Sequence, residues 1–253
     1  KIQGEQLSFF ANESPISDNE LVLENAFRVE VIDTKASLDA LVKRLHRAEI
    51  LAFDTETTST DQMEADLVGI SLAFEESGGY YIPVGHETGL GDQLSKEMVL
   101  EALRPALTDP ELQKVGHNVK YDYVILARQG LAVYPISFDT MLAEWVVNPD
   151  SRNLGLKKLA WVRLNHQMTK IEALIGKGKS QITMAEVPIK DVAAYAVDDA
   201  LVVLRLQPIL ERELQKVESK QLFDEIEMPL IPILAKMEMS GISLDCEFLQ
   251  EMS

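Results

Sequence analysis

The chain of 253 residues contains little cysteine, little positive charge and no long apolar run. Its one cysteine, Cys246, excludes an internal disulfide and is typical of a protein from a reducing compartment. No apolar run approaches the roughly 20 residues of a membrane-spanning helix. We therefore expect a globular protein that has no membrane among its partners.

The charge balance is strongly acidic, because 41 Asp and Glu residues outnumber 24 Lys and Arg residues to give a net charge of −17. Proteins that hold nucleic acid through its phosphates usually carry a basic surface. The balance therefore argues against a tight, free-standing DNA binder. It does not argue against an enzyme that holds a nucleic-acid end through metal ions, since metals neutralise clustered carboxylates and bridge them to phosphate.

The most informative stretch is residues 51–57, where an apolar strand, 50–53, leads into Asp54 and Glu56. Side chains alternate along a strand, so the two carboxylates project to the same side and repel each other unless a cation lies between them. A strand that ends in a polar loop would explain the same residues without any function. With no His or Cys nearby, the oxygen ligands suit Mg²⁺ or Mn²⁺, which predicts half of a metal site.

The rest of the chain alternates strands and helices. Residues 1–25 show no sustained periodicity and are interpreted as a linker or tail. We expect strands at 27–32, 67–74, 80–84, 114–118 and 136–139, and helices at 37–47 (capped by Ser37), 95–107, 119–129, 140–147 and over most of the chain from 154. Three early strands in succession indicate an antiparallel meander, and the later alternation indicates parallel strands with crossover helices. The expected fold class is α/β, a mixed β-sheet flanked by helices.

Later acidic residues compete to complete the metal site. Asp122 lies near a helix start, where the helix dipole alone would also favour it. Asp139 follows a strand and opens a helix, so we assign it mainly to an N-cap. Asp199 and Tyr195 are four residues apart on one inward helix face, where polar groups need partners. Asp198 faces elsewhere and is expected to be solvated.

Three motifs, at residues 54–56, 118–122 and 195–199, resemble those of the DEDD nucleases whose last motif carries tyrosine. Residues 67–71, 81–86, 138–141 and 176–179 resemble the 3′–5′ proofreading domain of bacterial DNA polymerase I, and the likeness covers about residues 28–215. Residues 226–245 are similar to the segment that opens the polymerase domain of that family. The resemblance implies a linker at 1–25, an exonuclease domain at 26–215 and a truncated start of the polymerase domain at 216–253.

This resemblance implies a ribonuclease-H-like fold and a 3′–5′ exonuclease that hydrolyses DNA with two divalent metal ions, Mg²⁺ or Mn²⁺. The implied metal ligands are Asp54, Glu56, Asp122 and Asp199, and Tyr195 would orient the attacking water. The implied partners are single-stranded 3′ ends of DNA and the polymerase domain of the same parent chain. The implied location is the bacterial cytoplasm, at the nucleoid through DNA.

The resemblance also implies six substrate contacts, which are Thr60, Asn118, Arg152, Ile171, Lys177 and Lys179. Thr60 stands where the family often has a leucine that wedges against the terminal base, and Ile171 where an aromatic side chain often lies. The smaller Thr60 would grip less, and Ile171 cannot stack on a base as a ring does. The three basic residues are equally well explained as solvated charges in loops.

Two alternative functions stay open. The first is a catalytically idle domain that only supports a polymerase, against which the complete set of carboxylates argues. The second is a related exonuclease that trims structured RNA, against which the polymerase-like residues after 215 argue.

Overall fold

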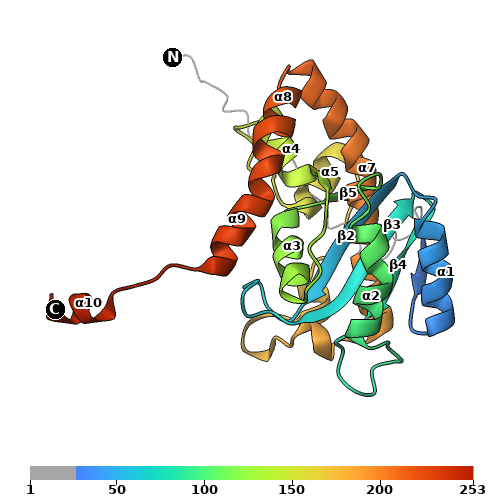
Figure 1. The fold of residues 1–253 in the computed structure, drawn as a ribbon. Helices are drawn as coiled ribbons and strands as arrows, with labels where there is room; N and C mark the ends of the chain where they lie inside the picture. The colour runs from blue at the N-terminus through green and yellow to red at the C-terminus, as the bar shows by residue number, and fades with distance from the viewer. Residues whose placement is uncertain (1–26, 253) are drawn as a thin grey trace, which may run out of the picture.

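A computed structural model describes residues 27–252 and contains a six-stranded mixed sheet between two helical layers (Figure 1). The strand order is β1-β4-β3-β2-β5-β6. β3 runs antiparallel to β2 and β4, and the other neighbouring strands are parallel. The strands are β1 (Arg28–Val31), β2 (Ile50–Thr57), β3 (Leu67–Glu75), β4 (Gly78–Pro83), β5 (Gln113–Gly116) and β6 (Ile136–Asp139). The predicted meander and parallel strands are confirmed.

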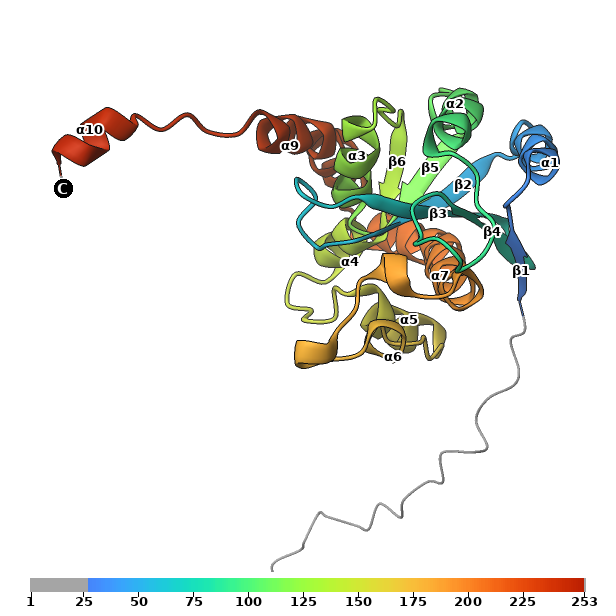
Figure 2. The same ribbon diagram turned by 90° about the horizontal axis from the view of Figure 1, so that it is seen from below.

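Helices cover both faces of the sheet, with α1 and α2 on one side and α5, α6 and α7 on the other (Figure 2). In chain order, the helices before residue 150 are α1 (Lys35–Leu45), α2 (Lys96–Leu107), α3 (Val119–Arg128) and α4 (Thr140–Val147). The later helical segments are α5 (Leu156–Leu164), α6 (Glu172–Ile175), η1 (Gly178–Ser180), η2 (Met184–Glu186), α7 (Ile189–Lys216), α8 (Lys220–Leu222), η3 (Phe223–Glu227), α9 (Met228–Ser240) and α10 (Cys246–Glu251).

Strand β2 lies in the middle of the sheet and is apolar on both faces at its start. Leu51, Ala52 and Phe53 are fully buried, as a strand covered by helices on both sides requires. The strand continues through Thr57, one residue past Glu56, so both carboxylates lie on it as the sequence predicts. The pairing with β3 therefore fixes the backbone on which both acids stand.

Helix α7 is the long element of the second layer, with 28 residues that contact β1 through β5. Its buried face includes Val192, Val202 and Leu206, all fully buried, at the spacing expected for an amphipathic helix. A helix that rests across so many strands cannot rotate without exposing core side chains. The direction in which its polar residues point is fixed for the same reason.

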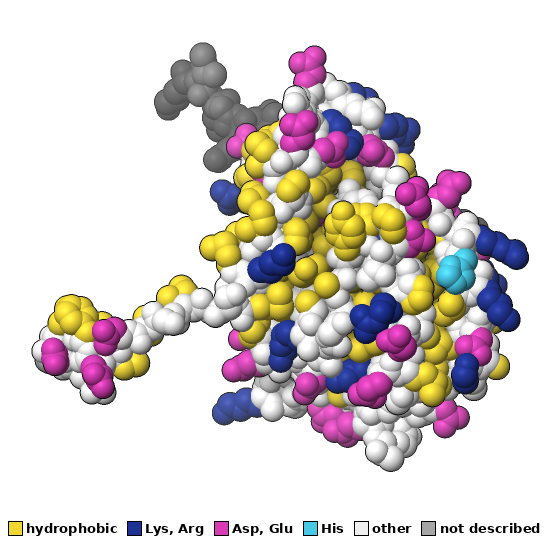
Figure 3. Space-filling view, in the orientation of Figure 1, with side chains coloured by type: hydrophobic (Ala, Val, Ile, Leu, Met, Phe, Trp, Pro, Cys, Tyr) yellow, Lys and Arg dark blue, Asp and Glu magenta, His cyan; other side chains and the backbone are white. Residues whose placement is uncertain are grey.

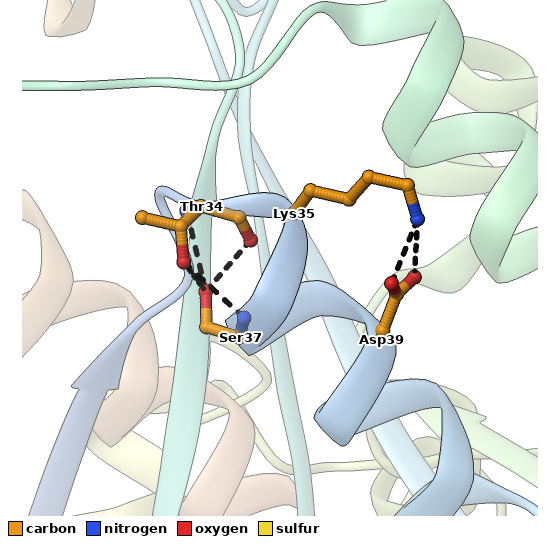
Figure 4. Close-up of polar contacts among 4 residues, drawn as sticks. All are labelled: Thr34, Lys35, Ser37 and Asp39. Carbon is orange, nitrogen blue, oxygen red and sulfur yellow. Dashed lines mark hydrogen bonds and ion pairs between the residues drawn. The ribbon is translucent and has the colours of Figure 1, made fainter.

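The start of α1 differs from the prediction in one detail. Thr34, and not Ser37, is the N-cap: the Thr34 side chain accepts the N–H of Ser37, and the Ser37 hydroxyl accepts the N–H of Thr34 (Figure 4). This reciprocal pair is a capping box in which serine takes the place of the usual Glu or Gln. The sequence alone does not show which of Thr34 and Ser37 is the N-cap, because both hydroxyls can accept a backbone N–H at a helix start.

The segment after α7 packs on the sheet domain as far as α9. Phe223 is fully buried, and its ring centroid lies 4.9 Å from that of Phe138 on β6. Helix α9 contacts α3 and the edge strand β6. The division at residue 215 stays a prediction, and residues 1–25 lie outside the described part of the chain. Within residues 27–252, no helix combines the length and apolar character needed to cross a membrane.

A partly buried ion network joins three helices of the second layer. Arg163 on α5 donates two hydrogen bonds, of 3.0 and 2.7 Å, to one carboxylate oxygen of Glu144 on α4. Its other terminal nitrogen lies 2.7 Å from Glu213 on α7. The Glu144 side chain is only 3% exposed, so it depends on Arg163 for compensation of its charge.

Arg163→Leu should therefore lower the free energy of unfolding by about 3 kcal/mol or more, because it leaves a buried carboxylate without its partner. Urea unfolding measures the loss. The double variant Arg163→Leu with Glu144→Leu should recover much of it, and Arg47→Leu at an exposed position should stay within about 0.5 kcal/mol of the wild type. An Arg163→Leu protein as stable as the wild type would contradict the assigned network.

Candidate active site

Three carboxylates from two elements converge at one place. Asp54 and Glu56 come from β2 and Asp199 comes from α7, and one oxygen of each lies within 4.8 Å of the others. Asp54 and Glu56 project to the same face because they are two residues apart on a strand. Asp199 meets them because α7 packs across that face. These are three of the four residues that the sequence predicted as metal ligands.

Asp122 lies beside this cluster and is engaged by β2 itself. Its Oδ1 accepts the backbone N–H of Thr55 at 2.8 Å and the Thr55 hydroxyl at 2.5 Å. Strand β2 pairs with β5 only at residues 50–52, so β5 offers no acceptor for the backbone N–H of Thr55. Asp122, in the first turn of α3, accepts that N–H instead. Asp122 is thus bound to the residue that separates the two acids of β2, and its charge acts on Asp54.

Burial and mutual repulsion make the ionised state of the cluster unfavourable. Burial, reinforced by the neighbouring Asp122, Glu56 and Asp199 charges, raises the pKa of Asp54 well above its usual range. Burial raises the pKa of Glu56 to about 8, and that of Asp199 to about 7. Burial also raises the pKa of Asp122, to about 7, although its hydrogen bonds from Thr55 oppose the shift. A multivalent cation bound among these carboxylates would offset the free-energy cost of their ionisation.

Tyr195 lies one helical turn before Asp199 on the same face of α7 and is only 9% exposed. Burial and the nearby Asp199, Glu56 and Asp54 charges raise the pKa of its hydroxyl far above the usual value, so the group stays a neutral phenol. The prediction that Tyr195 and Asp199 lie on one face of a helix is confirmed. That face is directed at the acidic cluster.

Lys157 is a residue of this site that the sequence analysis missed. Its Nζ donates to the Tyr195 hydroxyl at 2.7 Å and lies 3.7 Å from Asp199 Oδ1. Lys157 and Lys158 are adjacent at the start of α5, and Lys158 is exposed. The sequence carried no signal for choosing between them, because the packing of α5 on α7 determines which of the two points inward.

A second missed feature is the pair Tyr81 and His86 behind the acids. The Tyr81 hydroxyl lies 2.7 Å from His86 Nε2, and His86 Nδ1 lies 3.0 Å from the carbonyl oxygen of Val187, just before α7. A Cβ at Gly69, the residue that pairs with Glu56, would lie 2.2 Å from the Tyr81 hydroxyl. Glycine at 69 therefore makes room for the ring that links the cluster to the start of α7.

Asp139 has the structural role that the sequence predicted. Its carboxylate accepts the N–H groups of Met141 and Leu142 at the start of α4, at 2.8 and 3.2 Å. It also accepts those of Asn118 and Val119 at the start of α3, at 3.1 and 2.8 Å. One buried carboxylate thus joins two helix starts and positions the turn that carries Asp122.

Asp198 was predicted to be solvated, and this is wrong. The residue is 8% exposed, and its Oδ1 lies 2.8 Å from His166 Nε2 in the connection after α5. The prediction failed because α7 is covered on more than one face: α4 and α5 pack on it in addition to the sheet. Asp198 pairs with that second cover and not with the acidic cluster.

The six implied substrate contacts lie in exposed positions on connections or at helix starts. Thr60 is in the β2–β3 loop, Asn118 precedes α3 with a left-handed φ of 55°, and Arg152 is in the α4–α5 connection. Ile171 precedes α6 and is 38% exposed, and Lys177 and Lys179 lie before and within η1. Their roles stay predictions.

The mixed sheet with helices on both faces has a ribonuclease-H-like fold, which solved structures share. Escherichia coli RNase D, described as an exoribonuclease involved in structured RNA processing, matches with a TM-score of 0.65 at 19% identity, over 83% of this chain and 51% of that one. Brucella melitensis NrnC with bound Mg²⁺ matches with a TM-score of 0.63 at 20% identity, over 84% of this chain and 92% of that one. These similarities confirm the predicted fold class.

Sequence comparison gives the family. A family model described as 3′-5′ exonuclease matches residues 29–215. DNA polymerase I of Chloroflexus aurantiacus is 40% identical over 98% of this chain and 26% of its own length, and that of Pseudomonas aeruginosa is 38% identical over 87% and 24%. The chain therefore belongs to the 3′–5′ exonuclease family, in the form found within bacterial DNA polymerase I. It spans about a quarter of the length of these relatives.

The raised pKa values predict how stability without metal depends on pH. Because the folded protein holds protons on these acids that the unfolded chain has lost above about pH 4, stability should fall as pH rises from about 5 to 8. Asp54→Asn removes one of the repelling charges, so this variant should lose less stability over the same range, by on the order of 1–3 kcal/mol.

Urea unfolding in chelator at the two ends of this pH range measures the difference. Asp191→Asn, at an exposed position on α7, is the matched control and should follow the wild type. If the free energy of unfolding depends on pH in the same way for Asp54→Asn and the wild type, the pKa of Asp54 is not raised in the folded protein.

Proposed function

We propose that this chain removes nucleotides from single-stranded DNA 3′ ends by hydrolysis with two divalent metal ions, held by Asp54, Glu56, Asp122 and Asp199. The observation that carries the proposal is the convergence of three carboxylate oxygens within 4.8 Å, with a tyrosine hydroxyl beside them. A purely structural role would give each acid a basic partner, whereas here one lysine, Lys157, lies beside the three converging acids, at 3.7 Å from Asp199. Here their burial is costly unless cations bind.

The donor set fits Mg²⁺ or Mn²⁺. All the converging atoms are carboxylate oxygens, the ligands that hard divalent cations prefer, and they stand on separate rigid elements, β2 and α7. Asp122 on α3 would complete the set with the carboxylate oxygen that Thr55 does not contact. When bound, two such ions activate a water molecule and stabilise the charge that develops on the leaving 3′ oxygen.

Tyr195 has the position of a residue that orients the attacking water. Its hydroxyl stays protonated because of burial and the surrounding acids, so it can donate or accept a hydrogen bond without competing as a metal ligand. Lys157 donates to the same oxygen, which leaves the Tyr195 proton free to point towards the cluster. Holding a reactant in the correct geometry removes much of the entropic part of the barrier.

The proposed DNA substrate follows from the family, and the metal ions explain how an acidic chain holds it. Thr60 and Asn118 would contact the terminal nucleotides, Ile171 would pack on a base, and Arg152, Lys177 and Lys179 would contact phosphates. The loop that carries Thr60 is held in place, because the Tyr121 hydroxyl donates to the Ser59 carbonyl at 2.5 Å. A protein that acts on this substrate would be located in the bacterial cytoplasm, at the nucleoid.

Helix α9 offers a surface for the polymerase domain of the parent chain, which we propose as the second partner. Four large apolar side chains on α9 are 37–63% exposed at a spacing of three to four residues, namely Leu230, Ile233, Leu234 and Met237. Hydrophobic atoms gather over this helix in the space-filling view (Figure 3). A contiguous exposed apolar face of this kind is typical of an interface.

A cleavage assay tests the proposal. The wild type with Mg²⁺ or Mn²⁺ should shorten 5′-labelled single-stranded DNA stepwise from its 3′ end, and chelator should stop it. Asp199→Asn should lower the rate by at least about a hundredfold, since it removes a ligand with little change in shape, whereas Asp191→Asn on the same helix should not change it. RNA of the same sequence separates the RNA-trimming alternative, and no cleavage with either metal would favour the idle scaffold.

Tyr195→Phe tests the proposed role of the hydroxyl. The variant keeps the ring and should lower the single-turnover rate about tenfold to a hundredfold, because the water loses its orientation while the metal ligands remain. Stabilisation by Mn²⁺ in thermal melts should be retained. Tyr134→Phe, at a residue that is 67% exposed, is the control. An unchanged rate would remove Tyr195 from the mechanism.

A further inference from the structure

A positively charged side chain already occupies the edge of the acidic cluster. Lys157 Nζ lies 3.7 Å from Asp199 Oδ1, 2.7 Å from the Tyr195 hydroxyl and 4.1 Å from the centre of the Tyr195 ring. The ammonium group is therefore held by a carboxylate, a hydroxyl and the face of an aromatic ring. This is a specific position for a side chain that would otherwise extend into solvent.

The packing of α5 explains why Lys157 points inward. Leu159 and Ala160 are fully buried and fix the orientation of the helix, while Arg163 ties its end to α4 and α7. Lys157 lies on the adjoining face, directed at Tyr195, and its side chain is 30% exposed. It can reach the cluster and can also leave it for solvent without disturbing the core.

The charge of Lys157 acts on more than Asp199. It opposes the rise in pKa of Asp54, Glu56 and Asp199, so it stabilises the ionised form of acids on both β2 and α7. The protein has a net charge of −17, and the acids of the cluster repel one another. The positive charge of Lys157 offsets part of this repulsion.

We propose that Lys157 is the internal counter-ion of the carboxylate cluster and that it competes with divalent cations for Asp199. This inference rests on the proposed metal site. A divalent ion that binds Asp199 repels the ammonium group, so metal binding drives Lys157 away from Asp199. Lys157 thereby stabilises the metal-free protein and weakens metal binding, since part of the binding energy is used to displace it.

Two measurements on Lys157→Met test the proposal, because methionine keeps the aliphatic stem and removes the charge. In chelator, Lys157→Met should melt a few degrees below the wild type, since the repulsion is no longer offset. In calorimetric titration it should bind Mn²⁺ about tenfold more tightly, a ratio typical of competition between two coupled ligands. Lys157→Arg should resemble the wild type in both measurements, and Lys158→Met, which removes the same charge from an exposed position, should also resemble it.

The results separate this inference from the proposed function. If Lys157→Met binds Mn²⁺ no more tightly than the wild type, or if Lys158→Met gives the same gain, the competition is excluded. If the wild type binds no Mn²⁺ at all, the proposed metal site fails, and the melts in chelator still decide whether Lys157 is a counter-ion. Equal melting temperatures for Lys157→Met, Lys158→Met and the wild type would then overturn it.

Discussion

Repulsion between carboxylates that are buried or partly buried is the constraint on which this structure depends. Asp54, Glu56 and Asp199 are held close enough to raise one another's pKa values, and burial adds to the cost. Such a cluster persists only if the surrounding structure holds it there. The central strand β2 and the 28-residue helix α7 do so, because neither can move without exposing the apolar core between them.

A second set of polar contacts positions these elements and takes no direct part in the proposed chemistry. Thr55 fixes Asp122, and Asp139 joins the starts of α3 and α4. Arg163 joins α5 to α4 and α7 and so determines where Lys157 points. Each of these contacts is buried or partly buried, where removing one partner costs more than the bond itself contributes. The geometry of the cluster therefore depends also on Asp139 and Arg163, which lie outside the three nuclease motifs.

One acidic residue on α9 connects the segment after α7 to both α3 and the β2–β3 loop. Glu238 on α9 contacts Lys120 on α3, and its other oxygen accepts the side-chain N–H of Gln62 at 3.0 Å. Gln62 lies in the same β2–β3 loop as Thr60, and Arg128 holds that loop through the Gln62 carbonyl at 2.8 Å. A partner that binds α9 would thus act on a helix that contacts the proposed substrate loop.

The sequence by itself determined the mixed sheet, the positions of Asp54 and Glu56 on one strand face, and the shared face of Tyr195 and Asp199, because periodicities of two and 3.6 residues are local properties. It also determined the capping role of Asp139. Only the tertiary structure decided that Asp198 is buried against His166, and that Lys157 and not Lys158 reaches the acids. These outcomes depend on which helices cover α7 and at what rotation, and contacts between segments far apart in the chain leave no local pattern.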